Sequence, residues 1–123
     1  MSASVDLELK KAFQELQVQV IETRNRVKQM DLQMDALKRS SQHSRITLTQ
    51  LNDMPEDTLM YESVGRMFVL RHKSAINRLL EDKVLTNDEK CKQLSQNKTY
   101  NESKVKESEN NLRELINTKK LNP

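Results

Sequence analysis

Glycine and proline are nearly absent from this chain of 123 residues, which contains one Gly and two Pro. An average protein of this length would have about nine glycines and about six prolines. Because these residues form most tight turns, the chain has too few of them for a β-sandwich, a barrel or a wound α/β sheet. With two Phe, two Tyr and no Trp, it also cannot build a thick core. The composition leaves two options, long helices that share a narrow apolar seam or a disordered chain.

Residues 5–44 are predicted to form one long helix. Apolar residues recur there at alternating steps of three and four, with Thr23 as the single polar exception. This spacing is the heptad repeat of a coiled coil, and a disordered chain would not keep its phase over such a length. The a and d positions are Leu9, Phe13, Leu16, Val20, Thr23, Val27, Met30, Met34 and Leu37.

Residues 74–120 are predicted to form a second long helix, with a more polar seam. Polar seam residues lower the stability of a coiled coil but fix its register and its partner. Two seams of similar length, separated by a non-helical segment, predict an antiparallel pair of helices with both chain ends together. The fold class is therefore mainly α, in a single domain over 1–123. The second seam contains Leu80, Val84, Asn87, Cys91, Leu94, Lys98, Asn101, Val105, Ser108, Leu112 and Leu115.

The connecting segment, 45–72, differs in character from both helices. Residues 49–54 are expected to form one helical turn that ends at Pro55. Two short runs rich in β-branched, aromatic and other apolar residues then flank Gly65-Arg66. This arrangement predicts a β-hairpin at about 60–71 with a type II′ turn.

The predicted hairpin needs a partner, because a lone two-stranded hairpin is only marginally stable in water. Both of its faces carry apolar residues, and both edges have unpaired backbone groups. We therefore expect it to pair with hairpins of other chains; a small cap over the end of the chain's own coiled coil is the alternative. One face is expected to carry Val64, Met67 and Val69, and the other Tyr61, Phe68 and Leu70. The residues assigned to subunit assembly are these six and Gly65.

No pattern in the sequence points to catalysis or to metal binding. His43 and His72 have no second ligand at metal-site spacing. Cys91, the only cysteine, occupies a seam position that suits a small buried hydrophobic residue, and it cannot form an internal disulfide. We therefore expect no enzyme activity, no metal and no cofactor.

The charge distribution argues against nucleic acid as a partner. The 21 basic and 18 acidic residues give a net charge of +3, with both signs interspersed. No apolar run approaches the ~20 residues of a membrane span. The first residues also lack the basic and apolar regions of a secretory signal. These features predict an intracellular protein that binds neither nucleic acid nor membrane.

Apolar residues near both chain ends are more numerous than one seam can use. An antiparallel pairing would bring the two groups together at the open end of the coiled coil. A frayed but paired end and an exposed apolar surface for transient partners are both compatible with this pattern. The candidate binding residues are Val5, Leu7, Leu9, Phe13, Leu112, Leu115, Ile116 and Leu121.

Three stretches of the chain resemble the beta-type subunits of prefoldin. The middle stretch is the most specific of the three, because coiled coils resemble one another by composition alone. The resemblance extends over about residues 5–118. The stretches are VDLELKKAF at 5–13 with Glu15-Leu16, MYESVGRMFVL at 60–70, and VKE at 105–107 with NLRE at 111–114.

The resemblance implies an ATP-independent chaperone with two alpha-type and four beta-type subunits, and the single hairpin matches the beta type. In such a hexamer the hairpins form a double β-barrel, to which residues 61–70 would belong. The coiled coils extend from it, and the apolar residues near the chain ends would hold unfolded proteins such as actin and tubulin. Delivery would be to the cytosolic group II chaperonin, in the cytoplasm. The implied assembly partners are two alpha-type and three further beta-type subunits.

A structural or tethering coiled-coil subunit of another complex is the alternative function. It would explain the two seams, but it gives no reason for the strand pair around Gly65.

Overall fold

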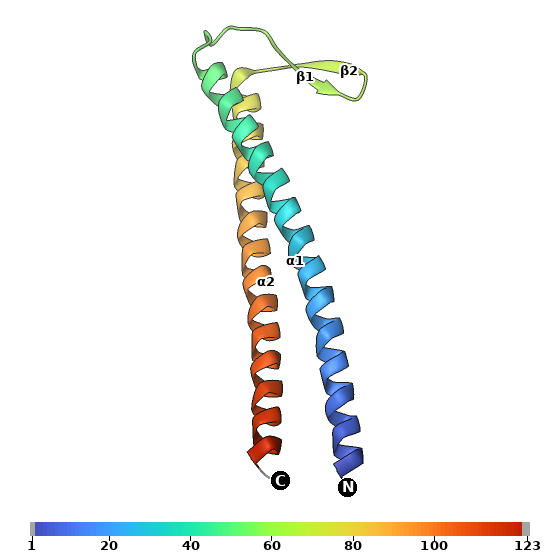
Figure 1. Cartoon of the computed structure of the whole chain (residues 1–123). Coiled ribbons are helices and arrows are strands. Elements are labelled where there is room, and N and C mark those ends of the chain that lie inside the picture. Colours follow the sequence, from blue (N-terminus) through green and yellow to red (C-terminus); the bar gives the residue numbers. More distant parts are fainter. Residues whose placement is uncertain (1, 122–123) are drawn as a thin grey trace. The chain divides into compact units, whose positions relative to one another are not determined.

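The fold consists of two long helices and one β-hairpin (Figure 1). A computed structural model of the chain describes the backbone of residues 2–121 and the side chains of residues 4 and 6–118. Helix α1 spans Ser2–Asn52 and helix α2 spans Lys73–Leu121. Strands β1, Met60–Val64, and β2, Met67–Arg71, lie between them in the sequence. The predicted mainly helical class with a single hairpin is confirmed for the part of the chain that the structure describes.

The chain divides into two compact units. One, here called the terminal unit, contains α1 through Leu32 and α2 from Leu94; the other, the hairpin unit, is Gln33–Gln93. The helix segments run antiparallel in each. In the terminal unit, Lys98 Nζ lies 2.9 Å from Asp31 Oδ1, and the beginning of α1 lies beside the end of α2 (Figure 1). In the hairpin unit, Cys91 Sγ lies 3.7 Å from the carbonyl oxygen of Met34.

The predicted seam of α1 is the less exposed stripe of the helix. Every seam residue from Leu9 to Leu37 is buried or half-buried, except Phe13, which is 45% exposed. Among the described apolar residues of both helices only Met34, at 9% exposure, counts as buried. The seam is therefore thin, as a chain with so few large apolar residues requires.

Helix α1 continues eight residues beyond its predicted end at residue 44. The heptad spacing persists through Ser41, Ser44, Leu48 and Leu51, all buried or half-buried, and no Gly or Pro interrupts it before Pro55. The predicted end fell too early because two of these seam residues are serines, which apolar spacing does not register. The separate helical turn expected at 49–54 was wrong, since its first residues are the last turn of α1.

The seam of α2 follows the predicted positions closely. All of them from Leu80 to Leu112 are buried or half-buried. Leu115 departs from the prediction, since it is 43% exposed, whereas its neighbour Ile116 is half-buried. The less exposed stripe of α2 therefore shifts by one residue near the end of the helix.

A polar layer lies in the core of the hairpin unit. Ser41, Ser44 and Asn87 are 2%, 1% and 8% exposed. Ser41 Oγ donates a hydrogen bond of 3.2 Å to Asp88 Oδ1, and Arg45 forms an ion pair of 2.6 Å with Asp88 Oδ2. Ser44 Oγ and Asn87 Nδ2 have no hydrogen-bond partner among the described residues. Small side chains at these positions allow the two helix backbones to approach closely.

The hairpin has the predicted position and turn. The antiparallel register pairs Val64 with Met67 and leaves Gly65 and Arg66 as the two turn residues. Gly65 has a φ of +60°, whereas Arg66 is not among the positive-φ residues. Positive φ at only the first of two turn residues distinguishes type II′ from type I′.

Candidate functional site

Two surfaces of the described structure expose apolar side chains in a cluster. One is a groove in the terminal unit and the other is the β-hairpin. Each is a candidate for interaction with another protein, because contiguous exposed apolar surface is characteristic of interaction sites.

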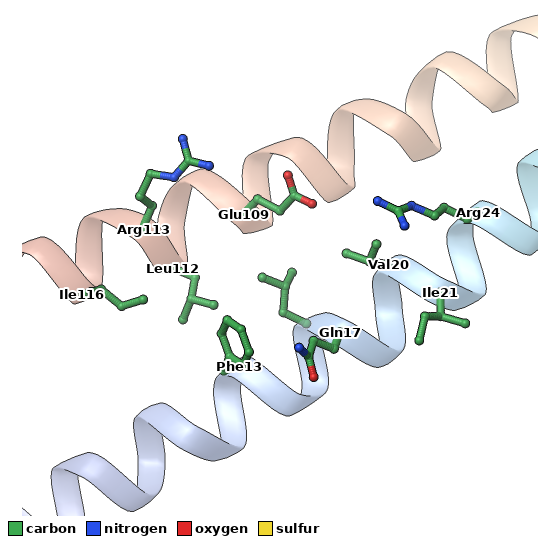
Figure 2. Close-up of a pocket in the computed structure, with 10 residues that line it drawn as sticks. Phe13, Gln17, Val20, Ile21, Arg24, Glu109, Leu112, Arg113 and Ile116 are labelled. Carbon is green, nitrogen blue, oxygen red and sulfur yellow. The ribbon is translucent and has the colours of Figure 1, made fainter.

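The groove lies between α1 and α2 within the terminal unit and has a volume of about 580 Å³ (Figure 2). Its apolar lining comes from turns of α1 and α2 that face each other. Figure 2 shows Phe13 and Leu112 pointing into the space between the two helices, with Ile116 at one end, Arg24 at the other and Glu109 between them on α2. The lining residues are Phe13, Leu16, Gln17, Val20, Ile21, Arg24, Glu109, Leu112, Arg113 and Ile116.

The groove contains three of the eight binding residues predicted from the sequence. These are Phe13, Leu112 and Ile116. Leu7, Leu9 and Leu115 do not line it, and the side chains of Val5 and Leu121 lie outside the described residues. The structure therefore gathers only part of the predicted set into one concavity.

Several groove residues were missed by sequence reasoning. Leu16 and Val20 had been assigned to the seam alone, although a thin seam leaves their flanks accessible. Ile21 is an exposed apolar residue directly beside a seam position, and such an off-seam residue was the available signal. The polar lining, Gln17, Arg24, Glu109 and Arg113, had no sequence signal, because charged residues occur all along both helices.

The hairpin presents its most apolar face to solvent. Residues paired across the strands share a face, so Tyr61 and Leu70 lie together with Ser63 and Phe68. Phe68 is 73% exposed, and Tyr61 and Leu70 are also exposed. This face carries no charged residue, and three of its four side chains are aromatic or aliphatic.

The opposite face of the hairpin is partly covered. It carries Met60, Val64, Met67 and Val69, of which Met60 is buried and Val69 half-buried. Arg71 Nε donates a hydrogen bond to Glu62 Oε2 on this face, within an ion pair. The register confirms the predicted division of apolar residues between the two faces.

Neither strand has a second neighbour among the described residues, because the sheet consists of β1 and β2 alone. Each strand therefore has an outer edge with free N–H and C=O groups. Such edges are ready to pair with a strand of another chain.

The described residues contain no group of three or more His, Cys, Asp or Glu side chains placed to hold a metal ion. Cys91 is free and half-buried in the seam. Lys98 is the one described group with a clear pKa shift: its hydrogen bond to Asp31 raises its pKa, which is the signature of a structural ion pair. In the part of the chain described, no helix is long and apolar enough to span a membrane.

This architecture occurs in a known protein family. The sequence profile of a family described as "Prefoldin subunit" matches residues 14–119. The chain belongs to the prefoldin subunit family. Prefoldin subunits are chaperone components rather than enzymes, and they assemble with other prefoldin subunits, which agrees with the two exposed apolar surfaces.

Similar prefoldin subunits cover nearly the whole chain. This chain is 49% identical over 116 residues to prefoldin subunit 1 of Tetraodon nigroviridis and 48% identical over the same length to prefoldin subunit 1 of Homo sapiens. Each alignment covers 94% of this chain and 95% of the relative. Prefoldin subunit 1 of Arabidopsis thaliana is 37% identical over 105 residues, which is 85% of this chain and 82% of the relative.

A solved prefoldin structure shares the fold. The prefoldin beta subunit from Thermococcus strain KS-1 matches with a TM-score of 0.72 over 88% of this chain and 91% of that chain, at 16% identity. The profile match and the similar subunits, together with this shared fold, confirm the resemblance to prefoldin subunits stated from the sequence.

Proposed function

We propose that this chain is a beta-type subunit of a hexameric, ATP-independent prefoldin chaperone. In this proposal the hairpin joins it to two alpha-type and three further beta-type subunits. The terminal unit captures unfolded or nascent proteins of the actin and tubulin class in the cytoplasm, for delivery to the group II chaperonin. The observation that carries the proposal is that one prefoldin chain has two separate exposed apolar surfaces.

The hairpin supports the assembly part of the proposal. Two strands of five residues each cannot bury the face of Tyr61, Phe68 and Leu70 by themselves. Strands from neighbouring subunits would extend the sheet at both edges, and closure into a barrel would remove the edges altogether. The face of Tyr61, Phe68 and Leu70 would then contribute to the barrel interior.

The groove supports the client part of the proposal. Its apolar floor can take a few hydrophobic side chains of an unfolded chain, a contact driven by burial of apolar surface. A shallow site of this kind binds weakly by itself, but six subunits together provide avidity. Weak separate contacts also allow release without nucleotide hydrolysis.

Reconstitution tests both parts together. Co-expression with the other five prefoldin subunits should give one complex whose mass by native mass spectrometry equals that of a hexamer. The complex should suppress the aggregation of chemically denatured actin in a light-scattering assay. A stable complex of other stoichiometry without such suppression would contradict the proposal and favour a structural or tethering role.

Variants separate the groove from the chain ends. Replacing Phe13, Leu112 and Ile116 with Ser should leave the hexamer intact and weaken the suppression of aggregation. Replacing Leu7 and Leu115 with Ser tests the exposed residues that lie outside the groove. Leu85→Ser serves as a control, because Leu85 is an exposed apolar residue that belongs to the hairpin unit. Unchanged suppression by the groove variant would remove these three residues from the client site.

A further inference from the structure

The two sides of the terminal unit differ in chemistry. The groove described above occupies one side. On the other side the same helices form a smaller depression, of about 190 Å³, whose lining is almost entirely polar. Its residues are Gln19, Glu22, Thr23, Arg26, Asn101, Lys104, Val105 and Ser108. The groove side is therefore the side of the terminal unit on which an apolar partner can dock.

The charges of α1 are sorted between these two sides. Residues seven apart lie on the same side of a coiled-coil helix, so Lys10 shares the groove side with Arg24. Glu8 and Glu15 likewise share the opposite side with Glu22. Helix α1 therefore presents Lys10 and Arg24 beside the groove, and the next residue of that row, Asp31, is paired with Lys98. The opposite side carries the three glutamates together with Arg26.

Helix α2 adds charges of both signs. Glu109 and Arg113 line the groove, and Glu102 lines an adjoining depression together with Arg24. Neither Arg24 nor Arg113 forms a hydrogen bond or an ion pair with any described residue. Both guanidinium groups are exposed and so remain available to a ligand. Lys106 lies seven residues before Arg113 and therefore on the same side, so α2 contributes two charges of each sign. The basic residues of α1 thus set the charge of the groove side.

We propose that the groove selects unfolded segments in which acidic residues flank apolar ones, and that Lys10 and Arg24 provide this selection. The inference rests on the proposed client-binding function and names the chemistry of the segment that binds. The apolar side chains would enter the groove between Phe13, Leu112 and Ile116. The flanking carboxylates would lie beside the basic residues of α1, and the glutamate row would disfavour docking on the other side.

The expected preference is modest because the charges are exposed. One exposed ion pair changes a dissociation constant only slightly, and two together change it by about two- to tenfold. At physiological ionic strength the Debye length is about 8 Å, so the position of each charge matters more than the net charge of the subunit. The selection should therefore depend on where the basic residues lie along α1.

Photo-crosslinking to the reconstituted hexamer tests this inference. The probes are an apolar peptide flanked by Asp and the same peptide flanked by Asn or by Lys, each with a photoreactive group. Mass spectrometry identifies the label attached to this subunit and distinguishes it from label on the other five subunits. The amount of label is measured as a function of peptide concentration. The Asp-flanked peptide should half-saturate at about two- to tenfold lower concentration than the Asn-flanked one, with the Lys-flanked one weakest.

A matched pair of double variants tests whether the position of the basic residues along and around α1 determines the preference. Lys10→Gln with Arg24→Gln should bring the Asp- and Asn-flanked peptides to nearly equal binding. Lys11→Gln with Arg26→Gln removes the same charge from adjacent positions on other sides of α1 and should preserve the preference. Circular dichroism of each hexamer shows that the helices remain folded.

The outcomes separate this inference from the proposed function. Equal binding of all three peptides at the groove, or equal losses in the two variants, would overturn the charge selection while leaving client binding in place. If no peptide labels the groove residues and the hexamer does not suppress aggregation, the proposed function fails as well.

Discussion

Gly65 is the residue on which the hairpin turn depends. Its φ of +60° lies in the left-handed region, which side chains with a Cβ rarely adopt. A Cβ built at this position would meet no atom within 4 Å. The requirement for glycine is therefore conformational and does not arise from crowding.

Gly65→Ala should weaken the hairpin by about 1–3 kcal/mol through backbone strain alone. The expected result is a lower melting temperature of the hexamer and a lower yield of complex on co-expression. Gly65→Asn should cost less, because Asn tolerates positive φ better than Ala. An alanine variant as stable as the parent would show that the turn can adopt another conformation.

Lys98 illustrates how a polar residue is accommodated at a seam position. Its ammonium group forms a hydrogen bond with Asp31 and is attracted by its charge, and both effects raise the pKa of Lys98. The attraction of Glu102 adds to this, whereas desolvation opposes it. The folded state therefore favours the charged lysine.

The pH dependence of this pair follows from the direction of the shift. Because folding raises the pKa of Lys98, its pairing with Asp31 contributes fully to the free energy of unfolding below the unfolded pKa of about 10.4. This contribution is lost as pH rises through the folded pKa. Asp31→Asn should bring the pKa of Lys98 back toward its ordinary value, as measured by NMR of its side chain. Glu102→Gln should have a smaller effect. The difference in melting temperature between the parent and Asp31→Asn should be constant from pH 6 to 9 and shrink above about pH 10.4.

At the scale of the helices, the polar layer of the hairpin unit combines a satisfied serine with an unsatisfied one. Ser41 Oγ donates to Asp88, whereas Ser44 Oγ has no partner among the described residues. Both are almost completely buried. Removing a satisfied hydroxyl and removing an unsatisfied one have different consequences, because a buried polar group is costly only when its hydrogen bond is missing.

Ser41→Ala should lower the stability of the complex by about 0.5–1.5 kcal/mol, whereas Ser44→Ala should leave it unchanged or raise it. Thermal melting of the hexamer, followed by circular dichroism, measures both. The two variants are matched in position, burial and size of the deletion, so each is the control for the other. Equal destabilisation by both would show that the Ser44 hydroxyl is satisfied in the assembled protein.

These serines also show where sequence reasoning about the helices failed. Heptad spacing located the seam residues from Leu9 to Leu112 because apolar periodicity reports directly on which face is buried. It missed the last turns of α1 because Ser41 and Ser44 are buried through their small size, a property that hydrophobicity does not report. The turn at Gly65 was predictable because it depends on local conformation alone.

At the scale of the whole chain, the groove between α1 and α2 was less predictable than the fold. Periodicity assigns Leu16 and Val20 to the seam but does not say how much of each side chain the partner helix covers. Lateral accessibility depends on how the helices pack in three dimensions, as does the one-residue shift from Leu115 to Ile116. The sequence therefore indicated the end of the coiled coil where the groove lies and only part of the residues that line it.

The isolated chain should self-associate through its hairpin. Without other subunits, the exposed face of Tyr61, Phe68 and Leu70 has no partner except another copy of the same chain. Sedimentation velocity should show larger species that increase with concentration. Phe68→Ser with Leu70→Ser should shift the chain toward monomer.

The control for this experiment is Leu79→Ser with Leu85→Ser, because both leucines are exposed on α2 outside the hairpin. This variant should self-associate as the parent does. A parent chain that stays monomeric with an ordered hairpin would contradict assembly through this surface.

The open hairpin has a consequence for the fate of an unassembled subunit. A chain without its partners exposes aromatic side chains and free strand edges, which are the features that distinguish an unfolded protein from a folded one. The same machinery that recognises unfolded chains would therefore recognise an orphan copy of this subunit. The subunit must therefore be made in the same amount as its partners. An excess copy, with its hairpin exposed, would itself be bound as an unfolded protein.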